Sequence, residues 1–269
     1  MNPTIVGTIV FACTLGGALG GLWLRTKLPE HHLNEESRDT VKLGIGLVAT
    51  MTALVLGLVT ASAKSAFDAV DTAVKHTAMD ILILDRVLAR YGPETGEIRG
   101  ALQHAFAHRI DMIWPQSSSR PVHLDPLGAA SASGMEELTD GIRGLTPHDD
   151  SQRSLQSRAL NLAEALLQAR WLVFTGSGTS IPLPFFLVLL FWLTITFASF
   201  GLFAPRNATV LVVLFVCAMS VGGAVFLILE MDGPFEGMVK VSADPLRYVY
   251  THLTSRRHVA IGTRLGRVG

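Results

Sequence analysis

Residues 43–63 read LGIGLVATMTALVLGLVTASA, an unbroken stretch without a charged side chain. A helix that crosses a bilayer needs about 20 mostly apolar residues, because each residue rises about 1.5 Å and the hydrocarbon core is about 30 Å thick. Three more uncharged stretches of that length lie at residues 3–24, 183–203 and 208–229. The sequence therefore predicts an all-α integral membrane protein with four transmembrane helices and a polar insert between the second and the third.

The composition fits this architecture. Of the 269 residues, 49% are hydrophobic and only 16% are charged. The formal net charge is zero, which gives no basis for nucleic-acid binding. Cys13 and Cys217 both fall inside uncharged stretches, so we expect no disulfide framework outside the membrane. The expected partners are the lipid bilayer, other copies of the chain and inorganic ions.

The first uncharged stretch is interpreted as a retained membrane helix, since no basic segment precedes it and no A-x-A cleavage site follows it. Gly16 with Gly20 and Gly17 with Gly21 form two overlapping GxxxG pairs. Such pairs let a second helix backbone approach closely, so they predict tight helix packing.

The second membrane helix is predicted to continue far beyond the membrane. No Gly-Pro break occurs between Glu35 and Tyr91, and Gly92-Pro93 then ends the helical pattern. A single helix over this range is on the order of 80 Å long at 1.5 Å per residue. Past the membrane its apolar residues repeat at spacings of three and four, which is typical of an amphipathic helix.

The insert is predicted to form a helical stalk with this long helix. Further helices are expected at residues 94–114 and 151–174, each with an apolar stripe. The Ser-, Pro- and Gly-rich residues 115–149 are expected to form a long loop with one short helix near residues 135–142. Three apolar stripes can bury one another in a bundle.

The domain organisation follows from these elements. Residues 1–64 hold transmembrane helices 1 and 2, residues 65–180 the helical extramembrane domain, residues 181–232 transmembrane helices 3 and 4, and residues 233–269 a membrane-edge segment with a basic tail. The membrane-edge segment is amphipathic and is expected to lie along the bilayer surface.

Four spans place both termini and the insert on one side of the membrane. The loop at residues 25–42 carries four Lys or Arg residues, and the region after residue 230 carries six. Because basic residues accumulate on the cytoplasmic side, this balance favours cytoplasmic termini and a cytoplasmic stalk.

One face of the second membrane helix is the leading candidate for a functional site. Small and hydroxyl side chains recur there at spacings of three and four, at Gly46, Thr50, Ala53, Gly57, Thr60 and Lys64. This small-residue stripe has two interpretations. It could provide a close helix contact. It could instead line a water-filled pore between several copies, with Lys64 as a charged ring at the mouth, unless Asp68 neutralises Lys64 as an i,i+4 pair.

Three carboxylates cluster at the end of the fourth membrane helix, Glu230, Asp232 and Glu236. Clustered carboxylates supply oxygen ligands of the kind that Ca²⁺ prefers. The same residues could instead cap the membrane boundary or pair with a neighbouring Lys or Arg. A cation site and a boundary role therefore both stay open.

His104, His108 and Asp111 share one face of the helix at residues 94–114, at spacings that a zinc ion can bridge. The sequence has no HExxH pattern and no Cys ligand near them, so a solvated helix face is the simpler interpretation. A phosphate-binding loop, a nucleophile elbow and a dinucleotide-binding loop are also missing from the sequence. We therefore expect neither an enzyme nor a cofactor.

Three places in the sequence resemble the bestrophin-like family of bacterial membrane proteins. The first is LPEHHLNEESRD at residues 28–39. The second is the second membrane helix with both its ends, from VKLGIG at residues 41–46 to AKSAFD at residues 63–68. The third is LEMDGPFEG at residues 229–237 with VSADPL at residues 241–246.

This resemblance implies kinship with bestrophins, which are pentameric anion channels with four membrane helices per subunit. In those channels the second helix lines the pore, and the termini and the large helical region are cytosolic. The resemblance therefore favours the pore interpretation of the stripe, in a bacterial cytoplasmic membrane. Bestrophin pores have a neck of bulky aliphatic and aromatic residues, whereas residues 43–66 contain no Phe, Tyr or Trp, so neither neck gating nor anion selectivity carries over from that neck. Glu230 and Asp232 are only loosely comparable to the acidic calcium clasp of animal bestrophins.

Two functions agree with these observations. The first is a homo-oligomeric ion channel, a homopentamer by resemblance, with an anion as the favoured ion. The alternative is a non-conducting membrane scaffold or sensor whose helical stalk binds a partner. The oligomeric state separates them, because a monomer or dimer does not readily enclose a pore from one helix per subunit.

Overall fold

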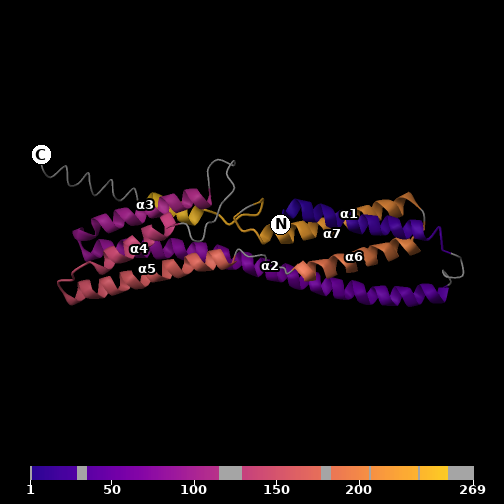
Figure 1. Ribbon diagram of the computed structural model, residues 1–269, viewed down its shortest axis with the longest axis horizontal. Coiled ribbons are helices and arrows are strands. Elements are labelled where there is room, and N and C mark those ends of the chain that lie inside the picture. The colour runs from indigo at the N-terminus through magenta and orange to yellow at the C-terminus, as the bar shows by residue number, and fades with distance from the viewer. Residues whose placement is uncertain are drawn as a thin grey trace. The chain divides into compact units, whose positions relative to one another are not determined.

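The computed structural model describes residues 2–28, 35–114, 129–176, 183–205, 207–235 and 237–253, and these residues form helices without any strand. The helices are α1 (Pro3–Leu24), α2 (Glu35–Tyr91), α3 (Gly96–Ile113), α4 (Ala129–Arg143), α5 (Asp150–Gly176), α6 (Leu183–Phe203) and α7 (Ala208–Met231), shown in Figure 1. A short 3₁₀ helix, η2 (Pro93–Thr95), follows α2, and residues 244–253 are also helical. The predicted all-α class is confirmed.

Four of these helices, α1, α2, α6 and α7, are long and apolar enough to cross a membrane. Their apolar side chains are widely exposed in the single chain; Leu43 and Leu54 on α2, for example, are 78% and 75% exposed. A lipid bilayer covers such surfaces, whereas water would not tolerate them over a whole helix. The chain is an integral membrane protein.

The chain divides into two compact units. The membrane unit consists of Met1–Phe67 and Thr179–Gly233, and the helical unit consists of Asp68–Gly178 and Pro234–Gly269. α2 contributes to both units and runs from Glu35 to Tyr91 without a break, as the sequence predicted.

Glycines bring α1 and α6 into backbone contact in the membrane unit. A Cβ atom on Gly17 would lie 2.8 Å from the carbonyl oxygen of Thr194 on α6. A Cβ atom on Gly21 would overlap the backbone at Ala198, and one on Gly201 would overlap the backbone at Ala18. Of the two GxxxG pairs in α1, the structure therefore uses Gly17 with Gly21 in this contact.

A second glycine contact joins α1 to α7. A Cβ atom on Gly7 would lie 3.2 Å from the carbonyl oxygen of Gly222, and one on Gly222 would lie 3.1 Å from that of Gly7. Near this contact, the rings of Phe11 and Phe215 meet edge to face with centroids 5.5 Å apart. Such close approach lets backbones and side chains gain van der Waals contact where lipid supplies no hydrophobic driving force.

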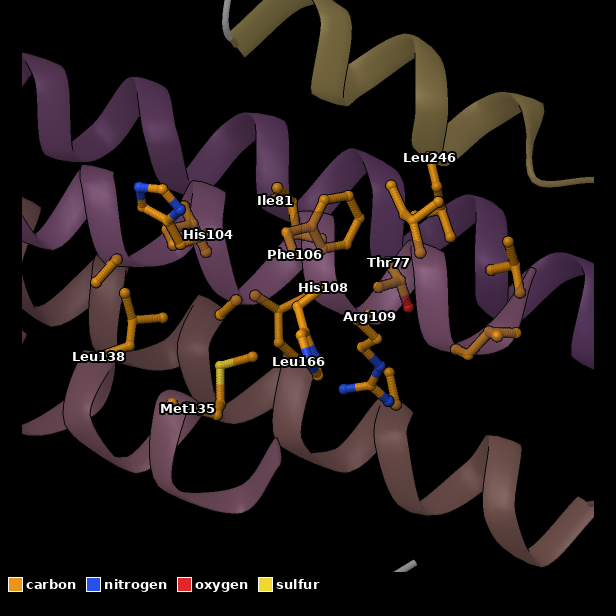
Figure 2. Close-up of a pocket in the computed structure, with 18 of the residues that line it drawn as sticks. Thr77, Ile81, His104, Phe106, His108, Arg109, Met135, Leu138, Leu166 and Leu246 are labelled. Carbon is orange, nitrogen blue, oxygen red and sulfur yellow. The ribbon is translucent and has the colours of Figure 1, made fainter. Parts of the chain in front are cut away.

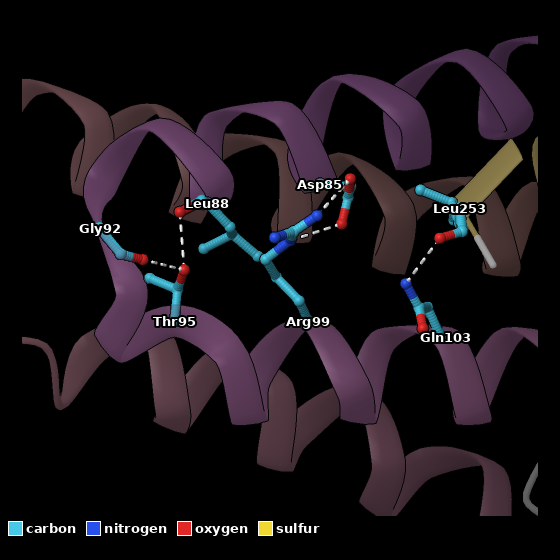
Figure 3. Close-up of polar contacts among 7 residues, drawn as sticks. All are labelled: Asp85, Leu88, Gly92, Thr95, Arg99, Gln103 and Leu253. Carbon is cyan, nitrogen blue, oxygen red and sulfur yellow. Dashed lines mark hydrogen bonds and ion pairs between the residues drawn. The ribbon is translucent and has the colours of Figure 1, made fainter. Parts of the chain in front are cut away.

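A buried ion pair holds α3 against α2 in the helical unit (Figure 3). Arg99 Nε donates to Asp85 Oδ1 at 2.7 Å, and an Arg99 terminal nitrogen donates to Asp85 Oδ2 at 3.0 Å. The Asp85 side chain is 5% exposed and that of Arg99 is 31% exposed. Paired donors on a nearly buried carboxylate fix both the distance and the rotation of the two helices.

The turn between α2 and α3 depends on Gly92 and Thr95. Gly92 has φ of +154°, a backbone conformation that other L-residues rarely adopt, so α2 ends at Tyr91 as the sequence predicted. The Thr95 hydroxyl lies 2.6 Å from the carbonyl oxygen of Leu88 and 2.8 Å from that of Gly92 (Figure 3). It therefore satisfies backbone oxygens that the end of α2 leaves unpaired.

The segment after α7 packs on α3. Trp114 Nε1 donates to the carbonyl oxygen of Val241 at 3.0 Å, and its ring meets Phe235 edge to face at 5.5 Å. Leu246 and Leu253 are buried as well. We expected this segment to lie along the bilayer surface; its buried side chains pack within the helical unit, whereas Met238 and Tyr248 are 83% and 70% exposed. The basic tail lies outside the described residues.

The structure also corrects the length of the helix expected near residues 135–142. α4 runs over fifteen residues, Ala129–Arg143, and its side chains Leu138 and Ile142 are 2% and 0% exposed. Gln156 on α5 donates to the carbonyl oxygens of Ile142 at 2.9 Å and Leu145 at 2.8 Å, which caps the end of α4. Ser- and Gly-rich sequence favours a loop, and packing against α3 and α5 overrides this preference.

The α1–α6 contact predicts opposite effects for two neighbouring glycines. Gly21→Ala should lower the free energy of unfolding by about 1–3 kcal/mol, because its Cβ atom meets the α6 backbone. Gly20→Ala is the matched control, since its Cβ atom meets nothing within 4 Å, and it should be neutral or stabilising by up to about 1 kcal/mol. Thermal unfolding in detergent, followed by circular dichroism, measures both. Equal shifts would contradict the contact.

Removing one partner of the ion pair should destabilise the protein more than removing both partners together. Arg99→Met should destabilise the protein by about 2–3 kcal/mol, because Asp85 stays buried and uncompensated. The double variant Asp85→Leu with Arg99→Met should recover most of this loss. Lys75→Met, which breaks the exposed pair with Asp71 at 2.6 Å, should cost at most about 1 kcal/mol. A double variant as unstable as Arg99→Met would show that the charges themselves are not responsible.

Candidate functional site

The six residues of the small-residue stripe all lie exposed on α2 within the membrane unit. The opposite side of the same helix faces the chain, where Thr52 is 5% exposed and Ala63 is fully buried. Val55 and Leu56 pack there against a core cluster that includes Val10. α2 therefore packs on its own subunit through another face than the stripe and leaves the stripe uncovered.

The stripe is not used for close packing within the chain. A Cβ atom on Gly46 or Gly57 would meet nothing within 4 Å, in contrast to Gly7, Gly17 and Gly21 on α1. Small residues at these two positions are therefore not required by any contact within the described chain. The close-contact interpretation of the stripe needs a second copy, as the pore interpretation does.

The hydroxyl groups of the stripe bond to their own helix. Thr50 Oγ1 donates to the carbonyl oxygen of Leu47 at 2.8 Å, and Thr60 Oγ1 donates to that of Leu56 at 2.7 Å. The hydroxyl hydrogens are thereby occupied, and the oxygen lone pairs remain as acceptors on the exposed face. In this rotamer the two threonines are suited to water or a cation, and an anion requires the hydroxyls to turn.

A third face of α2 is bulky and apolar. Leu47, Leu54 and Leu58 are 60%, 75% and 70% exposed and follow the stripe along one of its sides. On a helix in a bilayer, such side chains are satisfied by lipid tails or by another subunit. α2 is therefore divided into an intrachain face, a small polar face and a bulky apolar face.

An apolar cleft of about 590 Å³ lies beside the stripe in the membrane unit. Ile45, Gly46 and Ala49 line it from α2, and Phe200 and Val213 line it from α6 and α7. The sequence periodicity could not show this cleft, because it depends on the separation of helices that are far apart in the chain. Gly46 thus borders both the stripe and a groove open to the surroundings.

The carboxylates at the end of α7 differ in exposure. Glu230 is 6% exposed, Asp232 is half-buried at the helix end, and Glu236 lies outside the described residues. Within the described ranges, no three His, Cys, Asp or Glu side chains come together in a group that could hold a metal ion. The burial of Glu230 favours a structural role at the membrane boundary.

The candidate zinc residues do not assemble either. His104, His108 and Asp111 are exposed on α3 and are not part of any metal-binding group in the described chain. His104 and His108 instead line a pocket of the helical unit together with Arg109 (Figure 2). The sequence spacing puts the three residues on one helix, but in the described part they do not come together as a group that could hold a metal ion.

Tyr91 is a buried polar residue that sequence reasoning missed. It lies in the helical unit, beyond the apolar stretch of α2, and is 4% exposed. Its hydroxyl has no hydrogen-bond partner within the described chain. Burial, together with the nearby carboxylates Glu94 and Asp149, raises the pKa of this hydroxyl above its ordinary value of 10.0. Tyr91 therefore stays neutral and acts as a packing residue at the end of α2.

The fold and the uncovered α2 face thus define a four-helix integral membrane protein with a helical unit inserted between its second and third spans. The model of the bestrophin-like domain matches residues 12–246 of the chain, so the chain belongs to the bestrophin-like family. Comparison with curated proteins and with solved structures gave no significant match. The resemblance noted at residues 28–39, 41–68 and 229–246 falls within the matched range and is confirmed.

Proposed function

We propose that the protein is a homo-oligomeric ion channel of the cytoplasmic membrane, with the small-residue stripe of α2 lining a central pore. The observation that carries this proposal is the contrast between helices. Gly7, Gly17 and Gly21 of α1 are in contact with α6 or α7, whereas Gly46 and Gly57 of α2 face open space, as Gly16 and Gly20 of α1 also do. The small, hydroxyl-bearing face of α2 is exposed over its whole length, from Gly46 to Lys64, and is therefore available for an axis shared by several copies.

The assembly around that axis follows from the three faces of α2. One small face from each subunit encloses a water-filled path, because short side chains leave room that leucine would fill. The neighbouring bulky face, with Leu54 and Leu58, then meets the adjacent subunit or lipid. Five subunits are the expected number by kinship with bestrophins, and membership of the bestrophin-like family supports this number.

The sign of the permeant ion is proposed from the family, with an anion favoured. The threonine hydroxyls do not provide this preference in their present rotamer, since they donate to Leu47 and Leu56 and present oxygen lone pairs outwards. Turning a hydroxyl towards an anion costs about 0.5–1.5 kcal/mol for the bond it gives up. Selectivity would therefore depend more on the ring of Lys64 at the end of the stripe than on the threonines.

The orientation proposed for the channel places both termini and the helical unit in the cytoplasm. This orientation is supported by the excess of basic residues after residue 230 and by the arrangement in bestrophins. The alternative function, a non-conducting scaffold or sensor, predicts that the stripe is covered by lipid or by a partner helix instead of water.

The channel proposal predicts that bulk on the stripe blocks current. Gly57→Leu and Thr50→Leu should each reduce the conductance of purified protein in planar bilayers severalfold, because leucine fills the proposed path. Gly44→Leu is the matched control: it too meets nothing within 4 Å, but it projects from the other side of α2, so it should leave conductance unchanged. Reversal potentials in a salt gradient should show anion preference that Lys64→Gln weakens.

Silent bilayers with a verified oligomer, across anions and cations, would contradict the proposal. If mass measurement in nanodiscs finds a monomer or a dimer, the result would favour the alternative function, a non-conducting scaffold or sensor. Equal effects of Gly57→Leu and Gly44→Leu would place the path, if there is current, away from the stripe.

A further inference from the structure

The helical unit contains a pocket of about 330 Å³ that the channel proposal does not use (Figure 2). This volume lies at the lower end of the range for small-molecule sites. α2, α3, α4 and α5 all contribute to its wall.

The lining of the pocket extends along two helices. Its lining on α3 extends from Ala101 to Ile113, which corresponds to about 18 Å of helix at 1.5 Å per residue. Its lining on α2 extends from Val74 to Ile81, about 10 Å. The lining thus follows α3 for about three turns. This length accommodates an extended chain.

Most of the pocket wall is apolar, and its basic side chains all lie on α3. Ile81, Phe106, Leu138 and Leu166 are all buried and present only carbon to the space. Figure 2 shows the nitrogen atoms confined to His104, His108 and Arg109, which follow each other along α3. The two imidazoles are exposed and Arg109 is half-buried, so the basic side chains form the rim.

The basic side chains of the lining outnumber its acidic ones. The titratable groups are the two imidazoles and the Arg109 guanidinium on α3, and one exposed carboxylate, Glu137, on α4. The Thr77 hydroxyl donates to the carbonyl oxygen of Ala73 at 2.8 Å and so presents only its oxygen. A carboxylate is the head group that a guanidinium with two imidazoles recognises best.

We propose that this pocket binds a single-chain amphiphile, a medium-chain fatty acid, with its alkyl chain along α3 and its carboxylate at His108 and Arg109. The alkyl chain replaces void with carbon contacts along the apolar wall. The carboxylate remains at the rim, where it stays partly hydrated. The proposal does not depend on the channel function, because every lining residue belongs to the helical unit.

The test uses the full-length protein in lipid nanodiscs and dodecanoate with a diazirine at its terminal carbon. After illumination, peptide mapping should find the label on pocket residues such as Met135 and Leu166, and unlabelled dodecanoate should compete for it. Labelling confined to α1, α6 and α7 would overturn the proposal, because it would reflect probe dissolved in the bilayer.

Matched variants locate the alkyl chain. Ala169→Phe places a ring in the pocket from α5 and should abolish labelling there. Ala165→Phe, one turn earlier on α5 and also half-buried but not part of the lining, should retain it. Equal loss in two variants that both keep their circular dichroism spectrum would contradict the assignment. If Ala169→Phe does not fold, the map of labelled residues in the unaltered protein decides alone.

A second pair of variants tests the head group. Arg109→Gln should weaken competition by dodecanoate about tenfold, the effect of losing one hydrogen bond to a charged group, and should leave competition by dodecanol unchanged. Arg86→Gln, exposed on α2 and outside the lining, is the control. If dodecanol and dodecanoate compete equally and Arg109→Gln affects neither, the carboxylate assignment is wrong.

Discussion

The backbone contact between α1 and α6 is the constraint on which the arrangement of the membrane unit depends. Gly17, Gly21 and Gly201 let the two helices approach until a single added methyl group would overlap the facing backbone. In a bilayer the lipid competes with every apolar contact, so close van der Waals packing of this kind decides which helices associate. α1 also uses Gly7 against Gly222 of α7, so three of its glycines, Gly7, Gly17 and Gly21, are in contact within the subunit.

The glycines in the stripe of α2 make no close contact within the chain, and this observation supports the proposed function. α2 packs on its own subunit through larger residues such as Val55 and Leu56, so its stripe of small and hydroxyl residues is left uncovered. A helix that gains nothing within the chain from Gly46 and Gly57 still carries about 1 kcal/mol of cost for each glycine in its interior. Assembly around a shared axis explains why small residues occupy these positions.

Much of this architecture is predictable from local sequence, and the rest depends on tertiary contacts. Four uncharged stretches and the Gly92-Pro93 stop are local signals, so the spans and the end of α2 agree with prediction. The choice of Gly17 with Gly21 over Gly16 with Gly20 depends on where α6 lies, which no pattern within α1 encodes. The amphipathic segment after α7 has the same sequence pattern whether lipid or α3 packs against it. The hydrogen bond from Trp114 to Val241 shows that α3 packs against it. The stripe was predictable as one helix face, but its exposure was not.

The most direct test of the account is the water accessibility of α2 in the assembled protein. Single cysteines at residues 43–64, with Cys13 and Cys217 replaced by alanine, would be exposed to a membrane-impermeant thiol reagent in lipid vesicles. The account predicts labelling that recurs every three to four residues and peaks at Thr50, Gly57 and Thr60, with little labelling at Leu54 or Thr52. Uniformly low labelling along the whole stretch, or a maximum on the leucine face, would contradict a pore lined by this helix.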